Sequence, residues 1–132
     1  MRPENIRVPV LPPGPLDHGD CRSVASILAR IGDKWSVFVI MTLMDGPLRF
    51  NELKRLINGI SQRMLTLTLR GLERDGLVTR TVFPTIPPRV DYELTDLGRG
   101  LSKPVKALGQ WAFEHLPEIH GAREKFDARS GD

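Results

Sequence analysis

The sequence predicts a mainly α-helical fold with a small β-hairpin, on the basis of three observations. Five segments carry apolar side chains at helical spacing and are bounded by capping residues, glycines or prolines. One later stretch is rich in β-branched residues and alternates polar with apolar residues around a proline-containing loop. The chain has 132 residues, of which 40% are hydrophobic and 27% are charged, and this favours one globular domain.

The composition excludes several classes of protein. Cys21 is the only cysteine, so no disulfide can form within the chain and a secreted disulfide scaffold is excluded. The longest uninterrupted apolar run, residues 37–41, is far shorter than the roughly 20 residues that cross a bilayer. The first residues also lack the apolar core of a signal peptide. We therefore expect a cytoplasmic protein with no membrane partner.

Three regions divide the chain. Residues 1–19 hold five of the eleven prolines, which predicts an extended arm without regular structure. Residues 20–117 are expected to form the folded domain together with its dimerisation helices, and residues 118–132 a C-terminal tail. The first predicted helix spans residues 21–31 and has Asp20 as its N-cap. Its apolar face consists of Val24, Ile27, Leu28 and Ile31.

The second predicted helix spans residues 34–44 and is capped by Asp33. It has almost no polar face, so we expect it to be buried all round. Gly46 and Pro47 end it, because glycine permits a left-handed exit and proline cannot continue a helix. A short helix over residues 51–57 follows. The residues expected to face inward there are Phe50, Leu53, Leu56 and Ile57.

A longer helix is predicted over residues 61–75, with Ser61 as its N-cap. Its expected buried stripe consists of residues that recur at helical spacing, namely Ile60, Met64, Leu67, Gly71 and Leu72. The opposite face then presents side chains that donate hydrogen bonds to phosphates and to base edges. These are Gln62, Arg63, Thr66, Arg70 and Arg74.

Two strands are predicted over residues 77–83 and 89–94, with one arginine on each, Arg80 and Arg89. Thr95 is expected to cap a final helix that ends near residue 116. The order helix, short glycine-containing turn, helix and two-stranded ribbon predicts a winged helix-turn-helix. Because a major groove about 12 Å wide admits one helix, the 61–75 helix is the expected recognition helix. The ribbon, as the wing, would reach the flanking backbone or minor groove.

Positive charge is concentrated in the middle of the chain. Residues 46–90 hold eight basic and three acidic residues, a net charge of +5, whereas the whole chain has a net charge of +3. A focused positive region favours a polyanionic partner. Single-strand binders need exposed aromatic platforms, which this region lacks, so double-stranded DNA is the expected partner. The expected DNA contacts are Ser61, Gln62, Arg63, Thr66, Arg70, Arg74, Arg80 and Arg89.

The last predicted helix has an apolar stripe that a small domain cannot cover alone. Two-fold pairing of two copies would bury this stripe and set two recognition helices about 34 Å apart, one turn of DNA. The alternative is that the helix folds back on its own domain. The expected dimer interface consists of Val24, Leu28, Leu97, Leu101, Val105, Leu108, Trp111 and Ala112.

Five blocks of the sequence are distinctive when they are taken in order. They comprise residues 21–22 with 31–35, residues 48–53 (LRFNEL), residues 59–66 (GISQRMLT), residues 72–78 and residues 87–95. In these blocks the chain resembles the HxlR-type transcriptional regulators, a branch of the MarR-like winged-helix proteins. The resemblance covers about residues 21–113. It implies a homodimeric repressor or activator that binds double-stranded DNA and pairs through its N- and C-terminal helices.

Cys21 lies at a predicted helix N-terminus beside Arg22, where positive charge favours the reactive thiolate. Several HxlR-like proteins use a cysteine at the matching position to sense oxidants, quinones or aldehydes. The resemblance therefore implies a redox-sensing role for Cys21, with a small electrophile or oxidant as the effector. The alternative is that Cys21 is a small residue buried where the helix packs.

The sequence disfavours two other classes of function. An enzyme is disfavoured because the sequence has no catalytic triad, carboxylate pair, phosphate-binding glycine loop or metal motif, and no cofactor or metal is expected. A winged helix can also be a protein-interaction module that does not bind DNA. The basic free face of the 61–75 helix favours DNA over this alternative.

Overall fold

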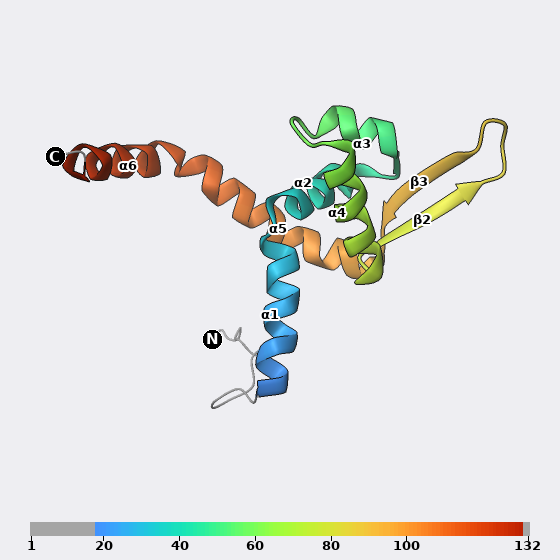
Figure 1. Cartoon of the computed structure of the whole chain (residues 1–132), viewed down its shortest axis with the longest axis horizontal. Coiled ribbons are helices and arrows are strands. Elements are labelled where there is room, and N and C mark those ends of the chain that lie inside the picture. The colour runs from blue at the N-terminus through green and yellow to red at the C-terminus, as the bar shows by residue number, and fades with distance from the viewer. Residues whose placement is uncertain (1–17, 131–132) are drawn as a thin grey trace.

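The computed structural model describes residues 18–130 (Figure 1), and within them the predicted mainly α-helical fold with a β-hairpin is confirmed. The predicted arm over residues 1–19 lies outside the described residues, except for its last two positions. In chain order the elements are α1 (His18–Gly32), α2 (Lys34–Thr42), the 3-10 helix η1 (Leu43–Asp45), β1 (Leu48–Arg49), α3 (Phe50–Leu56), α4 (Gln62–Arg74), β2 (Val78–Phe83), β3 (Arg89–Leu94), α5 (Asp96–Glu114) and α6 (Leu116–Ser130).

Three predicted N-caps are confirmed, at Asp33, Ser61 and Thr95. Each side chain accepts a hydrogen bond at 3.0 Å from the backbone N–H three residues later, which satisfies one of the free donors of the first helical turn. The predicted cap at Asp20 is wrong. α1 begins at His18, so Asp20 lies within the first turn of the helix and not before it.

The core lies where α2, α4 and α5 meet the base of the sheet. Its fully buried side chains include Val39 and Ile40 of α2 and Leu53 of α3. The prediction that α2 is buried all round is wrong, because Phe38 and Met41 on its other side are 44% and 37% exposed. One side of α2 packs into the core, and the other lines a shallow groove beside α5.

The predicted hairpin is confirmed, and it belongs to a three-stranded antiparallel sheet of order β1-β3-β2. β2 and β3 pair along their whole length, from Val78 opposite Leu94 to Phe83 opposite Arg89. β1, which was not predicted, pairs only with residues 91 and 92 of β3. Beyond this short edge strand the two longer strands continue away from the body and form the wing (Figure 1).

The described part of the predicted C-terminal tail over residues 118–132 is helical, because α6 extends to Ser130. α6 has polar residues all round, so no apolar stripe marked it as a helix in the sequence. Figure 1 shows that α1 projects from the body in one direction and that α5 and α6 lead away in another. None of the helices in the described part of the chain is long and apolar enough to cross a membrane.

Candidate nucleic-acid interface

α4 turns a leucine face towards the core and an arginine face towards solvent. Leu65, Leu69 and Leu72 are buried, at spacings of four and three residues. The predicted stripe is wrong for Met64 and Leu67, which are 37% and 51% exposed. The predicted stripe starts at Ile60, which lies before the first residue of α4. The position of Ile60 therefore does not determine which face of the helix turns towards the core.

The predicted outward face of α4 nevertheless carries the expected side chains. Gln62, Arg63, Arg70 and Arg74 are exposed, and Thr66 is half-buried with its hydroxyl donating to the Gln62 carbonyl. The Arg74 side chain is 84% exposed, and its contact with Asp75 is a long one at 4.0 Å. This face thus offers three guanidinium groups to an outside partner.

The wing brings Arg80 close to the same helix. Arg80 lies opposite Tyr92 in the ribbon, so the two side chains share one face of the sheet. A hollow of about 390 Å³ separates this face from α4, and both Arg70 and Arg80 line it. Two predicted contacts that are ten residues apart in sequence are therefore neighbours on one basic surface, with Glu73 as the acidic residue beside them.

Arg89 is more constrained than the sequence predicts. Its Nε lies 3.3 Å from Oδ1 of Asp91, and its guanidinium lies over the Phe83 ring with Cζ 4.2 Å from the centroid. The side chain is 38% exposed. Because a carboxylate and an aromatic ring both hold this cation, its contacts stabilise the ribbon itself. The Arg89 side chain is therefore less free than that of Arg80 to contact an outside partner.

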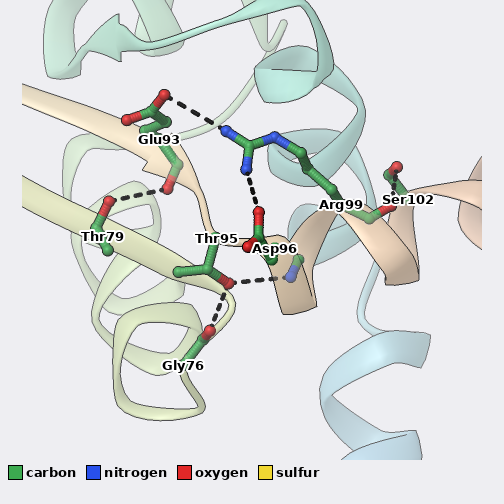
Figure 2. A network of polar contacts seen from close by, with 8 residues as sticks. Gly76, Thr79, Glu93, Thr95, Asp96, Arg99 and Ser102 are labelled. Atoms are coloured by element: carbon green, nitrogen blue, oxygen red, sulfur yellow. Dashed lines mark hydrogen bonds and ion pairs between the residues drawn. The ribbon is translucent and has the colours of Figure 1, made fainter.

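The base of the wing is fixed by a polar network (Figure 2). The Thr95 hydroxyl donates to the Gly76 carbonyl at 2.6 Å, while it also caps α5. Arg99 contacts Glu93 of β3 at 3.5 Å and Asp96 of α5 at 3.0 Å. The exit of α4, the end of the ribbon and the start of α5 are thereby held together, and the wing has a defined direction relative to α4.

The predicted dimer residues fall into three groups, which are exposed, half-buried and buried. Leu28, Leu97, Leu108 and Trp111 are between 55% and 63% exposed, and an apolar groove of about 600 Å³ lies between α1 and α5. Ala112 is exposed, and Val24 and Leu101 are half-buried. Val105 is wrong as an interface residue, because it is fully buried in the core of its own domain.

Cys21 is a free, exposed cysteine in the first turn of α1. In the single chain, Cys21 is therefore not a buried packing residue. Among the described residues, no group of three or more His, Cys, Asp or Glu side chains is arranged to hold a metal ion.

Two arginines that are not among the predicted DNA contacts also lie near the wing. Arg49 and Arg55 line a groove between α3 and the loop that joins β2 to β3. Arg55 lies 29 positions and Arg49 lies 35 positions before the start of that loop, so no local pattern could have placed them together.

Comparison with known proteins gives one consistent result. The model of the HxlR-like helix-turn-helix family matches residues 30–120. An uncharacterized HTH-type transcriptional regulator of Escherichia coli (strain K12), YtfH, is 38% identical over 99 residues, which are 75% of this chain and 79% of YtfH. The solved structure of YtfH from Salmonella typhimurium is 38% identical, with a TM-score of 0.72 over 76% of this chain and 90% of the other. The solved structure of the redox regulator HypR in its reduced form is 40% identical, with a TM-score of 0.69 over 75% of this chain and 98% of the HypR chain.

Proposed function

The chain belongs to the HxlR-like helix-turn-helix family and is a DNA-binding transcriptional regulator. From this premise we propose its oligomeric state, its mode of DNA binding and the site at which an effector acts. It is a homodimer that inserts α4 into the major groove of double-stranded DNA and lays the wing on the flanking backbone or minor groove. The effector acts through Cys21.

The observation that carries this proposal is the exposed arginine face of α4. Arg63 is exposed in the first turn of the helix, where free backbone N–H groups also favour phosphate, and this position supports its proposed contact with base edges. Arg70 and Arg74 lie further along the same face, where they would meet the backbone. Arg80 extends this surface onto the wing. An apolar face would instead have supported the protein-interaction module.

Pairing of two copies is supported by the apolar side chains that the single chain leaves uncovered. Leu97, Leu108 and Trp111 are more than half exposed along α5, and Leu28 is similarly exposed on the projecting α1. Full burial of one such side chain contributes about 1.5–3 kcal/mol, so a few of them on each copy can hold a dimer together. A two-fold pair would present two α4 helices to one face of the duplex.

The thiol response is supported by the exposure of Cys21 and by the likeness to HypR, which is described as a redox regulator. Because Cys21 is the only cysteine, any disulfide must join two subunits or join one subunit to a small thiol.

The proposal is tested by selecting binding sites from fragmented genomic DNA with the full chain. We expect enrichment of pseudo-palindromic sites whose half-sites lie about one helical turn, near 34 Å, apart. Enrichment of single asymmetric half-sites would contradict the dimer, and no enrichment together with salt-independent capture of a protein would favour the protein-interaction module.

A further inference from the structure

A groove of about 790 Å³ runs between α3 and the wing loop, outside the surface described above. Its α3 side is formed by Arg49, Asn51, Glu52 and Arg55, and its other side by residues 85–90. Arg49, Asn51 and Arg55 are all exposed. The α3 side of the groove therefore presents exposed polar and basic side chains that an outside ligand can reach, while Ile86, Pro87 and Pro88 line its wing side.

The charges in this groove favour an anion. Three guanidinium groups, those of Arg49, Arg55 and Arg89, line it against the single carboxylate of Glu52. That carboxylate is already engaged, because it accepts the backbone N–H of Arg49 at 2.9 Å and so caps α3. Arg89 is held by Asp91. Among residues 21–129, no ion pair joins Arg49 or Arg55 to a carboxylate, so both guanidinium groups can bind a ligand.

The groove lies at a different side of the wing from α4. β1 covers the edge of β3 only at residues 91 and 92, so that edge is bare at residues 89 and 90, where the groove begins. The hollow with Arg70 and Arg80 lies instead under the face of the ribbon that carries Tyr92. Figure 1 shows α3 on the β3 side of the projecting ribbon. The wing is thus flanked by two basic hollows.

This arrangement fits the shape of duplex DNA. A minor groove about 6 Å wide has a phosphate backbone on each side, so a ribbon placed on it meets phosphates on both of its own sides. Guanidinium groups bind phosphate oxygens through paired hydrogen bonds. We propose that Arg70 and Arg80 bind one of the two phosphate backbones that border the minor groove. The groove between α3 and the wing binds the other backbone through Arg49 and Arg55. The inference rests on the proposed function, because it assumes that the wing lies on the duplex.

Neighbouring residues of α3 provide a matched test. Arg55→Gln and Lys54→Gln each remove one positive charge from an exposed side chain, but only Arg55 lines the groove. The probe is a duplex of about 40 bp that carries a site selected by the wild-type chain and extends beyond the expected wing contacts on both sides. Binding is measured as a function of salt, and hydroxyl-radical footprinting reports which backbone positions are protected.

We expect Arg55→Gln to reduce the magnitude of the slope of log K against log[salt] by about 1.8, because each of the two subunits loses one phosphate contact, and the double variant Arg49→Gln, Arg55→Gln to reduce it by about 3.6. Protection should disappear from the outer backbone at each wing and stay at the α4 sites, while Lys54→Gln should keep both the slope and the footprint. Thermal melting checks that each variant is folded.

Equal slopes and footprints for Arg55→Gln and Lys54→Gln would overturn the inference while leaving the proposed function intact. The same holds if the groove variants bind DNA normally but lose regulation, because the groove would then belong to a protein partner. If the wild-type chain itself shows no salt-dependent binding to any duplex, the proposed function fails first.

Discussion

The Arg30 guanidinium contacts the Asp75 carboxylate, with 2.8 Å between Nε and Oδ2, and this ion pair joins the last turn of α1 to the end of α4. The Arg30 side chain crosses α4 at Gly71, where an added Cβ would collide with the guanidinium group. α1 carries the exposed Cys21, and α4 carries the proposed DNA contacts. The ion pair is therefore a direct contact between the proposed sensor helix and the proposed recognition helix.

Gly71→Ala should have different effects in two backgrounds. In the wild type, the new methyl group displaces Arg30. The loss of a partly exposed ion pair, about 1 kcal/mol at most, then offsets a gain of up to about 1 kcal/mol from alanine in a helix. In an Arg30→Ala background only the gain remains, so the same change should stabilise the fold by up to about 1 kcal/mol. Urea denaturation measures the change in the free energy of unfolding in each background. Equal changes in the two backgrounds would show that the Arg30 guanidinium does not depend on the absence of a side chain at Gly71.

Gly98→Ala should destabilise the fold, because an added Cβ would collide with the Leu77 backbone carbonyl, which cannot swing away as a side chain can. Overpacking of this kind costs about 1–3 kcal/mol. Gly100→Ala is the matched control in the same helix, since no atom lies within 4 Å of its added Cβ, and it should stabilise α5 by up to about 1 kcal/mol. A similar melting temperature for the two variants would contradict the close approach of α5 to the base of the wing.

Leu108→Asp should separate the proposed dimer into folded monomers, since Leu108 is 62% exposed on α5 and contributes little to the core of its own domain. Each copy would lose roughly 1–2 kcal/mol of burial free energy at the interface and gain a charge there. Sedimentation velocity measures the assembly, and Lys106→Asp on the same helix gives a control on an exposed polar position. A monomeric wild-type chain, or a dimer that survives Leu108→Asp, would rule out this interface.

Cys21→Ser should abolish release from DNA by diamide. Diamide takes two electrons and two protons from two thiols to form a disulfide, either between the Cys21 residues of two subunits or with an added small thiol. Wild-type protein should dissociate from its selected site when treated and rebind after dithiothreitol, as followed by fluorescence anisotropy. Release of the Cys21→Ser variant under the same treatment would show that the response does not depend on this thiol.

Local rules predicted the local structure well. The caps at Asp33, Ser61 and Thr95 depend on contacts three residues apart, and all three form as expected. Gly46, with φ of 145°, ends the 3-10 helix η1 that follows α2, and Gly76, with φ of 77°, follows the end of α4, and each of these features also depends on a single residue. These features could be predicted because each one depends on a short stretch of chain and not on tertiary packing.

The features that were missed depend on contacts between distant segments. Leucines at positions 65, 67, 69 and 72 permit more than one rotation of α4, and the core selects the one that buries Leu65 and Leu69. β1 is only two residues long and exists because β3 pairs with it. Val105 was assigned to a partner because its helix carries one continuous apolar stripe, of which part packs into its own core. The groove at Arg49 and Arg55 forms only when the wing folds beside α3.

The most direct test of the central claim, that the arginine face of α4 reads duplex DNA, compares Arg63→Ala with Arg123→Ala across a salt titration on a selected site and on a scrambled duplex. Both arginines are exposed, but Arg123 lies on α6, away from the proposed surface. We predict that Arg63→Ala costs about 1–3 kcal/mol on the selected site and reduces its preference over the scrambled duplex, while Arg123→Ala matches the wild type. Equal affinity and preference for the two variants would contradict the account.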